Sequence, residues 1–266
     1  MYETLRVTRE GHLTWCTLDR PDSLNAMSRA LVRDLRAFFW NLAEDRETRV
    51  VVLRGAGRAF CAGLDLKEAA SGEAGGDRSV PAGLRAQREI SELVLFMRRA
   101  PQPIIACVHG AACGGGFALA LGADVRLAGE SARMNAAFIR LGLSACDVGV
   151  SYFLPRYVGA SVAAELLLTG NFIDAARAER TGLVSRVVPD AELESAARTL
   201  AGEMLRNTPL GLRLTKECLR LSLDAGSLEE VVAMEDRNQI LAAQSSDFRE
   251  GVVAFLEKRP ARFSDE

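Results

Sequence analysis

The chain has 266 residues, of which 48% are hydrophobic and 26% are charged, and its formal net charge is −2. This length and balance predict a folded chain that buries a sizeable core. The near-neutral charge argues against a general basic field of the kind that binds nucleic acid or an anionic membrane.

Reactive and metal-ligating side chains are scarce. The six cysteines form no CxxC pair and most stand in apolar runs, which predicts buried, reduced thiols. His12 and His109 are the only histidines, so we expect no metal site built from histidine. No apolar leader opens the chain and no apolar run is long enough to span a membrane, so the expected compartment is the cytoplasm.

The first two thirds of the chain alternate short apolar runs with helical patterns. The turn Glu10-Gly11 separates two alternating runs and predicts a β-hairpin, and Ser28 is a suitable N-cap for the helix that follows. Residues 71–83 are rich in Gly, Ser, Ala and Asp and predict a mobile loop. We expect strands at 5–7, 13–18, 50–53, 104–108 and 124–128, and helices at 28–42, 84–99 and 114–121.

The pattern changes near Asp190, after which only amphipathic helical segments are predicted, at 190–205, 209–223, 227–244 and 246–258. We therefore predict an α/β core over residues 1–200 and a C-terminal helical region over residues 201–266. The amphipathic helices could support subunit contacts or fold back on the core.

Two segments carry the pattern of a binding site for a developing negative charge. Ala62 and Gly63 follow the strand at 50–53, and Gly114–Gly116 follow the strand at 104–108 and open a helix. A helix N-terminus exposes unpaired N–H groups, and glycine lets a ligand approach them. Two such N–H groups could form an oxyanion hole. The alternative is that these glycines only permit tight packing of helix on sheet.

Other glycine-rich sites are poorly supported. The glycines do not form GxGxxG followed by an acidic residue, and no GxxxxGK[ST] is present. The sequence therefore gives little support for a dinucleotide site and none for a P-loop.

The combination of segments resembles the crotonase (enoyl-CoA hydratase/isomerase) superfamily over essentially the whole chain. The resemblance rests on Leu18–Pro21 with Leu24–Met27, Phe60–Glu68, Pro103–Ala106 with Gly110 and Gly114–Gly116, Leu168–Gly170 with Gly182–Val184, and Phe255–Arg259. It implies a crotonase-like spiral core of ββα turns and a C-terminal helical trimerisation region. It also implies trimers, often paired into hexamers.

The resemblance implies an acyl-CoA substrate, with coenzyme A entering as part of that substrate and no separate cofactor. The N–H groups of Ala62 and Gly115 would form the oxyanion hole. The coenzyme A path would be lined by Gly63, Leu64 and Asp65 together with Leu24, while Lys258 would reach a phosphate, in some relatives across a subunit boundary. Lys258 could instead be solvated, and Asp65 could cap a helix.

The sequence departs from the family at the two glutamates that hold the water and move the proton in hydratases. Ala118 occupies one of these positions and Phe138 the other, just before Leu141-Gly142. Neither side chain can transfer a proton, so the two-carboxylate mechanism cannot be carried over.

Asp147 is the acidic residue that remains in a suggestive position, although its segment is one residue longer than the matching pattern. By resemblance to isomerase-type members, it could remove a proton next to the thioester, and burial would raise its pKa. The alternative is an N-cap of a helix that begins near Val148. We therefore expect an isomerase-like enzyme, with a non-catalytic acyl-CoA binding protein or an acyl-CoA hydrolase as alternatives.

Overall fold

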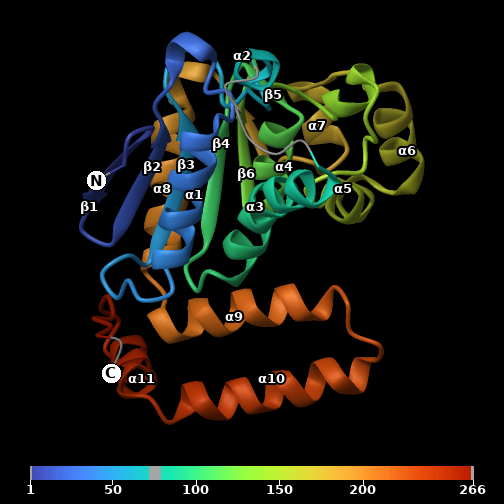
Figure 1. Cartoon of the computed structure of the whole chain (residues 1–266). Helices are drawn as coiled ribbons and strands as arrows, with labels where there is room; N and C mark the ends of the chain where they lie inside the picture. Colours follow the sequence, from blue (N-terminus) through green and yellow to red (C-terminus); the bar gives the residue numbers. More distant parts are fainter. Residues whose placement is uncertain (1, 72–78, 265–266) are drawn as a thin grey trace.

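A six-stranded sheet forms the centre of the molecule, with strand order β1-β2-β3-β4-β6-β9 (Figure 1). The computed structural model describes residues 2–71 and 79–264. Neighbouring strands are parallel except β1 and β2, which form the predicted antiparallel hairpin. The strands of this sheet are β1 (Leu5–Glu10), β2 (Leu13–Leu18), β3 (Val50–Gly55), β4 (Ile104–Val108), β6 (Val125–Gly129) and β9 (Arg186–Val188).

The period of two along the central strands divides the core between the two faces of the sheet. In β3, Val51 and Leu53 join the larger apolar cluster, whereas Val50 and Val52 join the smaller one. Because both faces are covered, β4 is buried throughout and β3 at every position except Arg54, which explains their continuous apolar runs.

Helices cover both faces of the sheet. In Figure 1, α1 and α3 lie in front of the sheet and α8 lies behind it. The helices of this part are α1 (Arg29–Asn41), α2 (Leu66–Ser71), α3 (Val80–Arg99), α4 (Gly115–Gly122), α5 (Val150–Val158), α6 (Ala160–Thr169), α7 (Ala175–Arg180) and α8 (Leu193–Leu205). Short 3-10 turns are η1 (Pro21–Ser23), η2 (Ala137–Leu141) and η3 (Asp190–Glu192). The predicted α/β class is confirmed.

Serine residues cap the N-termini of α1 and α3. Ser28 caps α1 as predicted, accepting the Leu31 N–H at 3.2 Å. The prediction that α3 begins at residue 84 was wrong: it begins at Val80, because Ser79 caps it and Pro81 occupies its first turn. Residues 72–78 of the predicted mobile loop lie outside the described residues.

A second, three-stranded sheet was not predicted. It has the order β5-β7-β8 and comprises β5 (Ala111–Cys113), β7 (Arg133–Asn135) and β8 (Ile173–Asp174). Strands of two or three residues are too short to give a detectable period. β5 is nevertheless important, because it carries the second glycine-rich segment from β4 into α4.

The C-terminal region is helical, as predicted, and comprises α9 (Pro209–Ser222), α10 (Leu228–Ala243) and α11 (Ser246–Leu256). In Figure 1, α9 and α10 lie side by side below the core, and α11 lies at the lower left. The predicted boundary at residue 200 falls inside α8, whose Ala197 and Ala201 are buried against the sheet. The chain leaves the core after Leu205.

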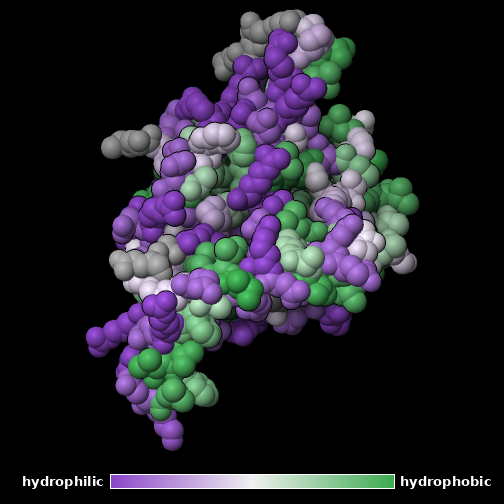
Figure 2. Space-filling view, turned by 90° about the horizontal axis from the view of Figure 1, so that it is seen from below, coloured by the Kyte–Doolittle hydropathy of each residue, from purple (hydrophilic) through white to green (hydrophobic). Residues whose placement is uncertain are grey.

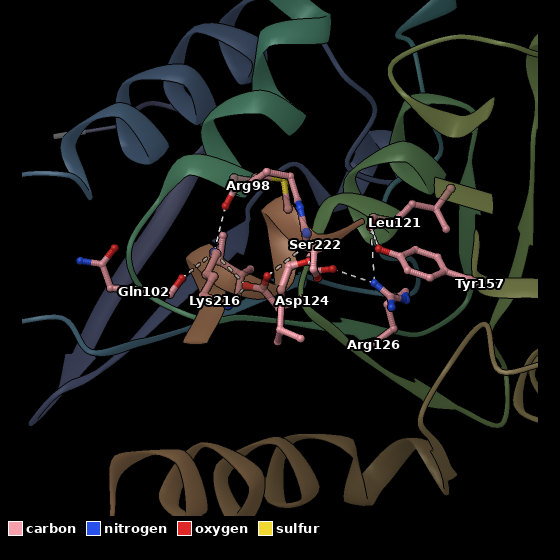
Figure 3. Close-up of polar contacts among 12 residues, drawn as sticks. Arg98, Gln102, Leu121, Asp124, Arg126, Tyr157, Lys216 and Ser222 are labelled. Carbon is pink, nitrogen blue, oxygen red and sulfur yellow. Dashed lines mark hydrogen bonds and ion pairs between the residues drawn. The ribbon is translucent and has the colours of Figure 1, made fainter. Parts of the chain in front are cut away.

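A buried lysine attaches α9 to the core (Figure 3). The Lys216 side chain is 5% exposed, and its Nζ pairs with Asp124 Oδ2 at 2.8 Å. The same Nζ donates to the Met97 carbonyl at 3.0 Å and to the Gln102 carbonyl at 2.8 Å. The ammonium thus has a partner for each of its three protons, as a buried charge requires.

Within residues 2–71 and 79–264, no helix combines the length and the apolar character needed to cross a membrane.

Candidate active site

The two glycine-rich segments singled out in the sequence lie side by side beyond the ends of β3 and β4. A parallel bridge pairs Cys61 with Ala112. The Cys61 N–H donates to the Ala111 carbonyl and the Cys113 N–H donates to the Cys61 carbonyl, each at 3.0 Å. The two segments therefore lie against each other, and the convergence of their N–H groups on one oxygen stays a prediction.

Close approach of these segments requires glycine at particular positions. Gly63 has a φ of +91°, and a Cβ there would lie 2.6 Å from the Cys113 carbonyl oxygen. A Cβ on Gly116 would lie 2.2 Å from the Cys61 carbonyl oxygen, and one on Gly115 would lie 2.5 Å from Met27 Sδ. The glycines therefore permit tight packing and also leave the backbone open, so the two interpretations of them are compatible.

The two predicted oxyanion donors differ in whether their N–H groups already have a hydrogen-bond acceptor within the chain. Gly115 is the first residue of α4, and its N–H has no acceptor among the described residues, as expected in a first helical turn. The Ala62 N–H donates to the Leu24 carbonyl at 3.0 Å. Gly115 is thus the open donor, whereas Ala62 must share or exchange its acceptor in order to bind a ligand.

A cavity of about 380 Å³ opens against both donors. Its wall is mainly apolar, as is usual for sites that bind organic ligands. The apolar side chains on its wall are Met27, Ala62, Leu64, Leu66, Ile90, Ala137, Phe138, Leu141, Leu143, Val148 and Phe172. The polar or sulfur-bearing side chains are Gln87, Cys113, Asn135, Arg140 and Asp147.

Asp147 is the one carboxylate that lines this cavity within the part of the chain that the structure describes. Its Oδ1 accepts the Val148 N–H at 2.8 Å and the Gln87 side-chain amide at 2.6 Å. Val148 has a φ of +46°, which is unusual for a β-branched residue and is typical of strain held at functional sites.

The interpretation of Asp147 as a helix cap was wrong. The helix begins at Val150, its N-cap residue is Gly149, and no side chain caps it. Asp147 precedes this cap by two residues and uses its side chain on the Val148 N–H instead. Gly149 fits the cap position because its φ is +80°.

Partial burial dominates the electrostatics of Asp147. Desolvation raises the pKa of this carboxyl above its ordinary value, and the hydrogen bonds from Val148 and Gln87 oppose that shift without cancelling it. A carboxylate with a raised pKa is a stronger base, so this environment suits proton removal from carbon.

The residues predicted to bind coenzyme A separate into two groups. Gly63 and Leu64 line the cavity. Asp65 accepts the Glu68 N–H at 3.2 Å, as a cap of α2 would, and pairs with Arg20 at 2.9 Å. Its burial opposes ionisation, but these partners outweigh that effect and hold the pKa of Asp65 below its usual range.

Leu24 and Lys258 do not line the cavity in this chain. Leu24 has a φ of +52° and directs its carbonyl to the Ala62 N–H. Lys258 is exposed and follows α11, which lies at the opposite end of the molecule from α2 and β5 (Figure 1).

The two positions at which the resemblance predicted the family's glutamates differ in their exposure to the cavity. Ala118 is fully buried within α4 and does not line the cavity. Phe138 lines it, and its ring lies 3.3 Å from the place that a Cβ of Gly114 would occupy. At position 138 the cavity wall therefore carries an apolar ring and no carboxylate.

Gln87 is a cavity residue that sequence reasoning missed, and Arg140 also lines the cavity. Gln87 carried a usable signal, because it stands three residues before Ile90 and seven before Val94, on the apolar stripe of α3. Arg140 donates to the Asn171 side chain at 2.7 Å. Across residues 2–71 and 79–264, no group of three or more His, Cys, Asp or Glu residues could hold a metal ion.

Comparison with known proteins agrees with this geometry. The enoyl-CoA hydratase/isomerase family model matches residues 8–266. A probable enoyl-CoA hydratase of Mycobacterium bovis is 41% identical over 252 residues, covering 94% of this chain and 88% of that protein. This chain belongs to the enoyl-CoA hydratase/isomerase family.

Further relatives extend the family to more than one reaction. The 1,2-epoxyphenylacetyl-CoA isomerase of Escherichia coli is 36% identical, with 93% of each chain covered. The crystal structure of an enoyl-CoA hydratase from Bacillus anthracis matches with a TM-score of 0.92 and 34% identity, over 99% of this chain and 100% of that one. Family membership confirms the predicted crotonase fold and a role in acyl-CoA thioester metabolism.

Proposed function

We propose that this enoyl-CoA hydratase/isomerase family member moves a proton within an acyl-CoA thioester, with Asp147 as the base. The observation that carries the proposal is the placement of Asp147 in the same cavity as the open Gly115 N–H. A base and an oxyanion donor that face one cavity are the two groups that enolate formation requires.

The proposed step needs no outside reagent. Asp147 takes a proton from a carbon activated by the thioester, so a C–H bond breaks and an O–H bond forms. The electron pair moves onto the thioester oxygen, which the Gly115 N–H stabilises with help from Ala62. Return of the proton to another carbon of the same conjugated system shifts the double bond and restores the carboxylate.

Isomerisation is favoured over hydration by the side chains at the glutamate positions. Ala118 and Phe138 cannot hold or activate water, and Phe138 makes the cavity wall apolar. The similarity to a 1,2-epoxyphenylacetyl-CoA isomerase supports isomerisation of a thioester in general. We propose that coenzyme A is part of the substrate and that no further cofactor takes part.

The predicted coenzyme A contacts remain part of this proposal in a modified form. Gly63 and Leu64 border the cavity and are suited to contact the pantetheine arm. Asp65 and Leu24 would act by holding the neighbouring backbone, since their polar groups are engaged within the chain. Lys258 would reach a phosphate only in a neighbouring subunit.

Self-association as a trimer or hexamer is the second part of the proposal. Figure 2 looks onto the underside of the molecule and shows apolar patches among the polar side chains. Such patches are typical of surfaces covered by a partner. Exposed apolar residues of α10 and α11 are Leu228, Val232, Ile240, Leu241, Phe248, Val252, Val253, Phe255 and Leu256.

The test uses a panel of 2-enoyl, 3-enoyl, dienoyl and saturated acyl-CoA thioesters with wild type, Asp147→Asn and Asp147→Ala. We expect a double-bond shift, detected by chromatographic retention at constant mass, and a loss of about 100-fold or more in both variants. Thioester binding should persist, because the cavity wall is otherwise unchanged. Glu68→Gln, a carboxylate change outside the cavity, is the matched control.

The same panel separates the alternatives. A mass gain of one water on a 2-enoyl thioester would contradict the isomerase proposal and establish hydration without the two glutamates. Release of free coenzyme A thiol would establish hydrolysis. Binding of several thioesters with no change in any of them would establish a non-catalytic binding protein.

A further inference from the structure

Gln87 stands out because it is a polar residue on the apolar stripe of a helix. On α3, the residues three and seven positions later are Ile90 and Val94. Ile90 lines the cavity, and Val94 packs 3.5 Å from the place that a Cβ of Gly149 would occupy. The stripe therefore faces the loop that carries Asp147, and Gln87 faces it with an amide.

The contact that results is short and specific. The Gln87 Nε2 donates to Asp147 Oδ1 at 2.6 Å, and the Val148 N–H donates to the same oxygen at 2.8 Å. No donor among residues 2–71 and 79–264 reaches Oδ2. The two oxygens of one carboxylate are thus made different by their surroundings.

We propose that Gln87 is a positioning residue that holds Oδ1 of Asp147, so that Oδ2 is the atom that exchanges a proton with the substrate. This inference rests on the proposed function and assigns its base to one oxygen atom. With Oδ1 held by two donors, the carboxylate cannot rotate freely, and Oδ2 stays directed to the cavity. Oδ2 accepts the proton from carbon and later returns it, and Gln87 loses and gains no proton.

Within the part of the chain that the structure describes, few charged or titratable groups lie around Asp147. Arg140 of η2 lines the same cavity but donates to Asn171. Cys113 of β5 also lines it, and burial raises the pKa of its thiol. Cys146 precedes Asp147 in the same loop and is exposed. Among residues 2–71 and 79–264, the pKa of Asp147 depends on burial, on Val148 and on Gln87, and no charged side chain contributes to it.

The sign of the expected pH effect follows from these contacts. A donor to a carboxylate favours the ionised form, so removal of the Gln87 amide raises the pKa of Asp147 further. A base acts only when it is ionised. The acid limb of the kcat/KM profile should therefore move to higher pH in a variant that lacks the amide donor.

The variants are Gln87→Leu, which removes the donor, and Gln87→Glu, which keeps the shape but offers a carboxylate in place of the amide. Gln239→Leu, the same change on exposed α10, is the control. For Gln87→Leu we expect about tenfold lower kcat/KM on the acid side, with recovery to within about twofold on the alkaline side. Gln87→Glu should move the acid limb further, because two carboxylates repel.

A second measurement does not depend on catalysis. Carbodiimide coupling to an amine requires a protonated carboxyl, so peptide mass spectrometry of Asp147 across a pH series reports its titration directly. We expect the midpoint of labelling to move to higher pH in Gln87→Leu and not in Gln239→Leu. An unchanged midpoint and an unshifted limb would overturn the inference.

The two measurements distinguish failure of this inference from failure of the proposed function. If wild type isomerises no thioester but the labelling midpoint moves, the contact is confirmed and the assignment of Asp147 as a base is overturned. A loss of rate that is equal at every pH would assign Gln87 a structural role and overturn the positioning role.

Discussion

The attachment of α9 to the core by Lys216 allows a quantitative prediction. Lys216→Met keeps the length and the apolar stem of the side chain but removes its charge. It leaves the Met97 and Gln102 carbonyls without their lysine donor and takes one cation from Asp124 (Figure 3). Removal of one partner of a buried pair typically costs about 3–5 kcal/mol.

The lower end of this range is expected, because Asp124 keeps other partners. Its Oδ1 still pairs with Arg98 at 3.2 Å, and its Oδ2 still accepts the Ile104 N–H at 2.8 Å. Its side chain is 20% exposed, so water can replace part of the lost contact. We therefore expect a loss of about 3 kcal/mol, or roughly 6–12 °C in Tm for a chain of this size.

The assay is urea unfolding followed by circular dichroism, with scanning calorimetry at one fixed protein concentration, because self-association would make Tm depend on concentration. Lys258→Met, at an exposed lysine, is the matched control and should change stability by less than about 0.5 kcal/mol. A Lys216→Met protein as stable as the Lys258→Met control would refute the reasoning.

Three further changes test the backbone, the buried thiols and a helix cap. Gly63→Ala should lower stability by about 1–3 kcal/mol and abolish activity, because φ is +91° and a backbone carbonyl lies 2.6 Å from the new Cβ. Gly11→Ala is the control: its φ is also positive, but its Cβ would lie in open space, so this variant should retain activity. Burial raises the pKa of Cys61 and of Cys107 to about 12, so the folded state binds more protons than the unfolded state above pH about 9. Stability should fall as pH rises from about 9 to about 12, by about 1.4 kcal/mol per pH unit for each thiol, and urea unfolding of Cys107→Ala should show a shallower slope. Ser28→Ala should cost about 1 kcal/mol in urea unfolding, and an unchanged midpoint would contradict the cap of α1.

The central strands and most helix boundaries were predictable because local physics determines them. The run Val50–Leu53 is apolar at every position, so it must be covered on both faces whatever the rest of the chain does. Ser28 caps its own helix through a contact three residues away. Such contacts join residues that are close in the sequence, so a sequence pattern can predict them.

The glycine-rich segments were predictable only in part. The residues of each segment indicated open N–H groups, and the resemblance to a family related one segment to the other. The state of each N–H depends on distant backbone: the Leu24 carbonyl engages Ala62, whereas Gly115 stays open at the start of α4. A spacing in sequence does not specify which carbonyl will approach which amide.

The amino-acid sequence by itself determined the α/β class, the helical C-terminal region and the family. Only the tertiary structure decided that Asp147 faces the cavity instead of capping α5, and that Gln87 meets it from sixty residues away at 2.6 Å. It likewise decided that Lys216 reaches Asp124 beneath the core. The physical reason is that burial and hydrogen-bond direction at these sites are set by the packing of separate elements, which no local pattern encodes.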